Sequence, residues 1–288
     1  MPTTARVIRQ DGIEIATEAF GDAEHAPVLL IMGGMASMLW WPDEFCRRLA
    51  ARGHFVIRYD QRDSGLSTKY PPGQPGYGFD DAVDDTFRVL DGYRITAAHI
   101  AGFSQGGMVG QGAALKHPER LLSLTAISTS PLGVDWSSLP KSGEAWLEHM
   151  AADVDWSDRA VAVAYSVKDA RLIAGTAYEF DEAATRAFLE KDFDRSGGYA
   201  SATNHSVLFK TGKVWQRRLG ELRPPLLVIH GTADPVFPIG HGVALCEAVA
   251  GARILKLEGG GHALHAGHWD RIVDAIAEHT SRESSRGR

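Results

Sequence analysis

Cysteine is scarce in this sequence, with only Cys46 and Cys246 among 288 residues. Both fall in helix-like segments, so we expect buried small side chains and neither a disulfide framework nor a metal site. Long apolar runs are also missing. The longest aliphatic stretches, residues 28–32 and 226–229, are far too short to cross a bilayer, and residues 1–12 lack the apolar segment of a signal peptide. We therefore expect a cytoplasmic protein that makes no contact with a membrane.

An excess of basic charge is likewise absent. The chain carries 30 Lys and Arg against 36 Asp and Glu, which gives a formal net charge of -6. This balance provides no basic stripe for nucleic acid or anionic lipid, so we expect neither as a partner. The overall composition, 44% hydrophobic and 23% charged, is typical of a globular protein. The length suits one large core, or one core that carries an inserted module.

Short apolar runs alternate with helix-period segments through much of the chain. The runs that read as buried strands are residues 28–32, 54–60, 95–103, 121–128 and 224–231. Strands buried on both faces and joined by helices indicate a parallel sheet. Near the start of the chain, Ile13, Ile15 and Thr17 alternate with other residues directly after Asp11-Gly12. This pattern predicts two short antiparallel strands that are joined by a turn at Asp11-Gly12.

The alternation of strands and helices stops between residues 131 and 213. This segment reads as short helices rich in acids and aromatic residues. We predict that residues 131–213 form a helical insertion between two core segments, residues 1–130 and 214–280. A polar tail at residues 281–288 completes the predicted organisation.

One pentapeptide, Gly102-Phe103-Ser104-Gln105-Gly106, matches the pattern G-x-S-x-G where an apolar strand meets a helix. In that context the serine sits on a strained turn, and side chains at the two glycine positions would collide with the neighbouring strand and helix. A glycine-rich packing turn is the alternative interpretation. We predict that Ser104 is a nucleophile.

A serine hydroxyl needs a base, and the chain order Ser, Asp, His supplies one. His262 follows a further strand-like run, residues 253–259, and lies directly behind three glycines, whereas Asp234 follows the run at residues 224–231. The carboxyl ends of strands are where open α/β sheets bind ligands, which favours a triad of Ser104, Asp234 and His262. His265 is the main competitor for the base, and an Asp-Pro turn is the alternative role of Asp234.

Attack on an ester produces an oxyanion, which requires two backbone N–H donors. We expect one from Gln105 at the start of the helix. The second is expected from Gly34, with Met35 as the alternative, because this glycine-rich loop lets the backbone approach closely. Met35, together with Trp136 and Trp146 of the insertion, is also predicted to line the substrate pocket.

In chain order, the segments MGG, YDQRDSGLS, GFSQGG, HGTADPVFP and GGGHALH resemble the motifs of serine α/β-hydrolases. Details such as GGMASMLWWPDEF and GHAL are similar to aclacinomycin methylesterase and its bacterial relatives, which remove a methyl ester from an anthracycline polyketide. The resemblance covers about residues 27–130 and 225–280 and fades through the insertion. It implies a mostly parallel eight-stranded sheet flanked by helices, with a helical cap after the sixth strand. It also implies the triad Ser104, Asp234 and His262, and no cofactor.

The leading interpretation is a serine esterase that cleaves a small-molecule ester, a methyl ester of a bulky or aromatic acid, without cofactor or metal. Perhydrolase (cofactor-free haloperoxidase), lactonase, C–C hydrolase and aminopeptidase activities use the same triad and remain alternatives. A non-catalytic receptor of the same fold is the alternative from another class, since a fold does not determine function.

Overall fold

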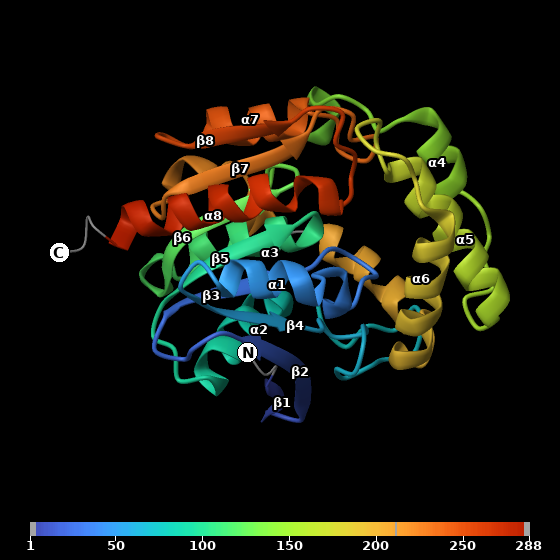
Figure 1. Cartoon of the computed structure of the whole chain (residues 1–288), viewed down its shortest axis with the longest axis horizontal. Coiled ribbons are helices and arrows are strands. Elements are labelled where there is room, and N and C mark those ends of the chain that lie inside the picture. Colours follow the sequence, from blue (N-terminus) through green and yellow to red (C-terminus); the bar gives the residue numbers. More distant parts are fainter. Residues whose placement is uncertain (1–3, 211, 285–288) are drawn as a thin grey trace.

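The computed structural model describes residues 4–210 and 212–284, in which eight strands form one sheet in the order β1-β2-β4-β3-β5-β6-β7-β8 (Figure 1). The strands are β1 (Thr4–Gln10), β2 (Ile13–Phe20), β3 (Ala26–Ile31), β4 (His54–Tyr59), β5 (Ala98–Phe103), β6 (Leu121–Ile127), β7 (Leu226–Gly231) and β8 (Arg253–Leu257). From β4 to β8 every neighbouring pair is parallel. The predicted mostly parallel sheet is confirmed.

The predicted hairpin is formed by β1 and β2, and every residue of β1 is paired with a residue of β2. Asp11 and Gly12 between them have φ angles of 53° and 77°. A two-residue turn with both φ angles positive matches the right-handed twist of the strands that it joins. The second strand then pairs antiparallel with β4 and attaches the hairpin to the parallel part of the sheet.

Helices cover both faces of the sheet. The helices that follow the strands are α1 (Asp43–Ala50), α2 (Phe79–Gly92), α3 (Gln105–Lys116), α7 (Gly240–Ala248) and α8 (Trp269–Ser284). One face packs against α2, α3 and α7 through side chains such as Val83, Met108 and Leu245. The other face packs against α1 and α8 through Phe45 and Ile272. Burial on both faces explains why the central strands are continuous apolar runs.

Helix α8 continues to Ser284, so residues 281–284 of the predicted polar tail are helical. The remainder of that tail, residues 285–288, lies outside the described residues. Cys46 is buried and Cys246 is partly buried, and neither forms a disulfide within the described part of the chain. Among the helices of residues 4–210 and 212–284, none is both long and apolar enough to cross a membrane.

Between β6 and β7 the chain forms a cap at one end of the sheet, where Figure 1 shows its three main helices gathered. Its elements are the 3-10 helix η3 (Trp136–Ser138), α4 (Glu144–Met150), α5 (Arg159–Ile173), α6 (Glu182–Ser196) and the 3-10 helix η4 (Ser201–Phe209). The side chains of Asp158 and Asp181 cap the N-termini of α5 and α6. A small apolar cluster that includes Val163, Leu189 and Tyr199 holds these two helices together.

Two buried carboxylates tie the cap to the sheet. Asp60, at the end of β4, pairs with Arg195 of α6, with 2.8 Å between Oδ2 and Nη2. The second carboxylate belongs to the cap. Asp192 of α6 accepts hydrogen bonds from the Ser37 hydroxyl and, at 3.2 Å, from the Trp40 indole, and both donors lie in the loop after β3. Burial raises the pKa of Asp192, while these donors favour its carboxylate. Because a buried carboxylate is costly unless it is paired, these contacts hold α6 against the loop.

Candidate active site

Ser104 occupies the turn between β5 and α3, with φ 53° and ψ -122°. This is a region that side chains rarely adopt, as the sequence motif predicts. A Cβ at Gly102 would overlap the carbonyl oxygen of Gly106, and a Cβ at Gly106 would overlap the carbonyl oxygen of Ile31. The two glycines therefore let the strand and helix approach closely enough to place the serine at the tip of the turn.

The structure brings Ser104, His262 and Asp234 into one hydrogen-bonded chain. His262 Nε2 lies 2.8 Å from Ser104 Oγ, and His262 Nδ1 lies 2.7 Å from Asp234 Oδ2. The Asp234 side chain is fully buried, whereas the serine is only partly buried. Since a carboxylate can only accept, Nδ1 carries the proton and Nε2 is free to accept the serine proton.

Asp234 also stabilises the turn that follows it, which is the alternative role considered for this residue. Its Oδ1 accepts hydrogen bonds from the backbone N–H groups of Val236 and Phe237, both at 2.9 Å. The two roles are compatible because they use different oxygens. His230 lies 3.5 Å from Asp234 Oδ2 but donates its Nε2 proton to the Phe237 carbonyl at 2.7 Å. Burial lowers the pKa of His230, so the carboxylate faces a neutral ring on this side.

His265, the competing histidine, lies in a different environment. Its ring stacks on Tyr178 with centroids 4.4 Å apart, and its Nδ1 accepts the N–H of Gly267 at 3.1 Å. His265 thereby caps the short helix η7 (Ala266–His268). The geometry selects His262 as the partner of Ser104.

The loop that carries His262 is joined to the cap through its backbone. The N–H of His262 donates to the carbonyl of Ile173 at 2.7 Å, and Gly260 forms an isolated β-bridge with Gly175. A Cβ at Gly261 would overlap the Ile173 carbonyl oxygen. The glycine run therefore has a more specific function than loop freedom, because it lets the end of α5 pack directly against the histidine loop.

Gly34 and Gln105, the two expected oxyanion donors, face each other beside Ser104. A Cβ at Gly34 would lie 3.0 Å from Gln105 Oε1, and one at Gly33 would lie 3.1 Å from the Cβ of Ser104. Gln105 is the first residue of α3, where backbone N–H groups have no acceptor within the helix. The loop is thus close enough to the serine for its N–H groups to meet an oxyanion.

Met35, the alternative donor, already has an acceptor. Its N–H donates to His205 Nδ1 at 2.8 Å, so the geometry favours Gly34 as the donor, and the choice between the two stays a prediction. Met35 has φ 62° and a partly buried side chain. His205 could not be predicted from the sequence, because no motif or spacing connects a histidine of the insertion to a loop 170 residues away.

Aromatic rings lead outward from His262 toward the cap. Phe237 packs on His262 with centroids 5.6 Å apart, and Trp136 packs on Phe237 at 5.5 Å. Trp136 in turn contacts Phe209, and 41% of the tryptophan surface is exposed. These rings form a continuous series of contacts from His262 to the surface of the cap.

Trp146, the second predicted pocket tryptophan, contacts a carboxylate of the cap. Its indole N–H donates to Asp169 Oδ1 at 3.1 Å, and its ring packs on the cluster of Ile173, Val236 and Phe237. Burial raises the pKa of Asp169, although the nearby His149 and Trp146 favour its charged form. Trp146 therefore has structural partners within the cap and at the turn after Asp234, and its predicted place in the substrate pocket stays a prediction.

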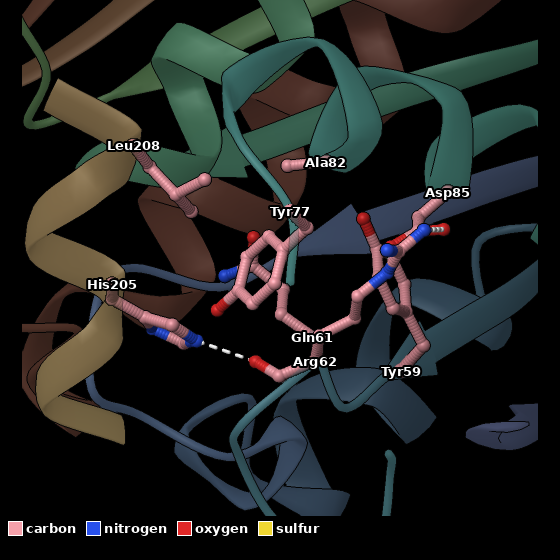
Figure 2. A pocket seen from close by; sticks show the side chains of 8 residues that line it. All are labelled: Tyr59, Gln61, Arg62, Tyr77, Ala82, Asp85, His205 and Leu208. Carbon is pink, nitrogen blue, oxygen red and sulfur yellow. Dashed lines mark hydrogen bonds and ion pairs between the residues drawn. The ribbon is translucent and has the colours of Figure 1, made fainter. Parts of the chain in front are cut away.

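The structure also contains a small cavity that does not include the triad. Figure 2 shows it between Gln61, Tyr77, Asp85 and His205. No group of three or more His, Cys, Asp or Glu side chains is arranged to hold a metal in the described residues.

A family model for the alpha/beta hydrolase fold matches residues 26–268. The chain belongs to the α/β-hydrolase family. Rhodomycin D methylesterase DauP of Streptomyces sp. strain C5 is 35% identical to this hydrolase over 301 aligned residues, 97% of this chain and 98% of that protein. Rhodomycin D methylesterase DnrP of Streptomyces peucetius is 34% identical with the same coverage.

Among solved structures, the enol-lactonase from Burkholderia xenovorans LB400 superposes on this hydrolase with a TM-score of 0.76 and 20% identity. The alignment covers 96% of this chain and 100% of that one, and at this identity it shows the fold alone. The predicted α/β-hydrolase fold, the resemblance to the methylesterase family and the predicted class of carboxylic ester hydrolase are confirmed by the family match and the two methylesterase relatives.

Proposed function

We propose that this hydrolase removes the methyl group from a methyl ester of a bulky, aromatic, polyketide-like acid through an acyl-enzyme on Ser104. The observation that carries the proposal is the chain from Ser104 Oγ through His262 to the buried Asp234, with distances of 2.8 and 2.7 Å. The nearly full-length similarity to two rhodomycin D methylesterases supports the methyl ester as the bond that is cleaved.

In the proposed mechanism, His262 takes the proton of Ser104 as its oxygen bonds to the ester carbon. The Gly34 and Gln105 N–H groups stabilise the oxyanion, and Asp234 stabilises the imidazolium. Collapse of the intermediate breaks the bond to methoxide, which leaves as methanol with the proton from His262. Water, activated by the same histidine, then releases the acid from the serine.

The rings beside the triad support an aromatic acyl group. Phe237 packs between His262 and Trp136, and the exposed part of Trp136 offers an apolar surface that suits a planar ring. An aminopeptidase would need carboxylates to bind a peptide amino terminus, but the candidate acids of the cap are all exposed, namely Glu144, Glu148, Asp153, Asp155 and Asp158. They form a solvated face, so nothing in their placement supports the aminopeptidase alternative.

A substrate panel tests the proposal. We expect the purified full chain to release methanol from a polycyclic aromatic methyl ester with kcat/KM at least about tenfold above that for methyl acetate, a difference of ~1.4 kcal/mol in transition-state binding. A fluorophosphonate should label Ser104, as read by peptide mass spectrometry, and chelators should leave the rate unchanged.

The same panel distinguishes the alternatives. Turnover of lactones or C–C substrates without methyl esters would replace the proposal with those activities, and peroxide-dependent halogenation would indicate a perhydrolase. Tight binding of an aromatic ester without turnover would indicate a receptor.

Three other features stay predictions from the sequence. They are the cytoplasmic location, the lack of a nucleic-acid partner and the division of the chain at residues 130 and 213.

The cap tryptophans are predicted to determine which esters are accepted. We expect Trp136→Ala to change the ranking of polycyclic and small methyl esters, because it removes the outer ring of the series that begins at His262. Hydrolysis of a small activated ester should stay within about tenfold, or ~1.4 kcal/mol, since the catalytic groups are untouched. Trp146→Ala tests the second position.

Trp156→Ala is the matched control for the tryptophan variants, because that ring packs on Tyr165 within the cap. Steady-state kinetics on both ester classes give the ranking. An equal loss on large and small esters for Trp136→Ala would show that its role is structural.

A further inference from the structure

His205 of η4 projects from the cap to the back of the loop that carries Gly34. It is 2% exposed and makes three hydrogen bonds, through both ring nitrogens and its own carbonyl. Figure 2 shows the ring beside the small cavity, with Nε2 directed at the backbone carbonyl of Arg62. None of the proposed catalytic steps requires a histidine at this position, so its burial and bonding need a separate explanation.

The hydrogen bonds determine the tautomer of His205. Nε2 lies 2.6 Å from the Arg62 carbonyl oxygen, which can only accept, so Nε2 carries the proton. Nδ1 accepts the N–H of Met35 at 2.8 Å and is therefore unprotonated. Burial lowers the pKa of His205, which keeps the ring neutral. A neutral imidazole is suited to this position, because it accepts on one side and donates on the other.

The bond to Met35 orients one of the two peptide groups that flank the Cα of Gly34. The other is the Gly33–Gly34 peptide. Its carbonyl oxygen, which belongs to Gly33, accepts a hydrogen bond from the side-chain amide of Gln61 at 3.4 Å, and the Met32 carbonyl accepts one from the same amide at 2.8 Å. The N–H and C=O of a trans peptide point in opposite directions. With the Gly33 carbonyl directed at Gln61, the Gly34 N–H points away from Gln61.

The third bond of His205 reaches the other oxyanion donor. The backbone carbonyl of His205 accepts the side-chain amide of Gln105 at 2.9 Å. The same glutamine side chain lies against Gly34. One cap residue therefore touches both segments that supply the expected donors, the loop at Gly34 and Met35 and the first residue of α3.

We propose that His205 is a positioning residue, which holds the backbone N–H groups of Gly34 and Gln105 in the geometry that binds the oxyanion and so makes this geometry depend on the docked cap. The inference rests on the proposed function, because it needs an oxyanion to be formed at Ser104. It goes beyond that function by assigning part of the cap to transition-state stabilisation as well as to substrate selection.

Two near-isosteric variants separate the ring's contacts. His205→Asn keeps an acceptor at the place of Nδ1, for the Met35 N–H, and His205→Gln keeps a donor at the place of Nε2, for the Arg62 carbonyl. We expect His205→Gln to lower kcat by ~10- to 100-fold with KM changed less than about threefold, since oxyanion donors act on the transition state. His205→Asn should retain roughly tenfold more activity than His205→Gln.

An aryl trifluoromethyl ketone provides the second measurement. It forms a hemiketal with Ser104 and places an oxyanion at the two donors, so its Ki should rise by the same factor as kcat falls. His99→Gln is the matched control, because His99 is equally buried and bonds Ser123 at 2.8 Å nearer the start of β5. Loss of stability without loss of kcat is expected for that variant.

Wild-type protein supplies a test that needs no variant to fold. In ¹⁵N spectra of uniformly labelled protein, His205 should show the neutral Nε2–H tautomer, and the Met35 amide should exchange slowly with solvent. An unchanged kcat and Ki in His205→Gln would overturn the inference while ester hydrolysis by the wild type still supported the proposed function. A fast-exchanging Met35 amide would also overturn it. A wild type that hydrolyses no ester would instead remove the proposed function itself.

Discussion

Replacing Ser104 with alanine will lower kcat for methyl-ester hydrolysis by about 10⁶-fold, the order of magnitude found when a serine-protease nucleophile is removed. Alanine keeps the Cβ at a position where φ is 53°, so the backbone of the turn is no more strained than with serine. The side chain loses only the hydroxyl that contacts His262. We therefore expect an unchanged melting temperature, measured by differential scanning calorimetry.

The matched control is Ser123→Ala, which removes a buried serine hydroxyl nearer the start of the neighbouring strand β6. This variant should keep its kcat. Retention of near-wild-type activity by Ser104→Ala would contradict the acyl-enzyme mechanism as a whole, whatever the substrate.

Asp234→Asn should lower kcat by about 10⁴-fold, by analogy with the serine-protease triad. Two backbone N–H groups hold Oδ1 of Asp234 at 2.9 Å, and an asparagine would place its own oxygen there. Its NH₂ group would then face Nδ1 of His262 and select the tautomer with the proton on Nε2. That tautomer cannot accept the proton of Ser104, although all three side chains stay in place.

Rates measured between neutral and alkaline pH test this prediction, because hydroxide can assist a serine that has lost its base. Asp153→Asn is the control for the change in charge, since it neutralises an exposed carboxylate of the cap. A loss of less than about tenfold in Asp234→Asn would mean that orientation of the imidazole contributes under ~1.4 kcal/mol here.

The catalytic side of the sheet was predictable because its signals are local. A short apolar run predicts a buried strand. The turn at Ser104 is predicted by two glycines, because a Cβ at either position would overlap neighbouring backbone atoms. Asp234 and His262 follow strands that are adjacent in the sheet, so chain order alone brings them together. These inferences need no knowledge of the cap.

The contacts of the cap were not predictable for the opposite reason. His205 meets Met35 across 170 residues, and Arg195 meets Asp60 across 135. Helix α6 buries Leu189, Asp192, Phe193 and Ser196 at helical spacing, but two of these four residues are polar, so hydrophobic periodicity in the sequence does not indicate which face turns inward. The sequence left Met35 open as an alternative donor for the same reason, because its N–H is paired with a residue of the insertion.

The backbone join between the end of α5 and the histidine loop limits how the insertion can be exchanged among relatives. Residues 173–177 supply a carbonyl to His262 and two N–H groups to Gly259. A chimaera that replaced residues 131–213 as one interchangeable block would also remove the backbone on which the base rests. Transfer of substrate preference by grafting should therefore spare residues 173–177, and the natural variation that changes specificity is expected in η3, α4 and α6, on either side of that segment.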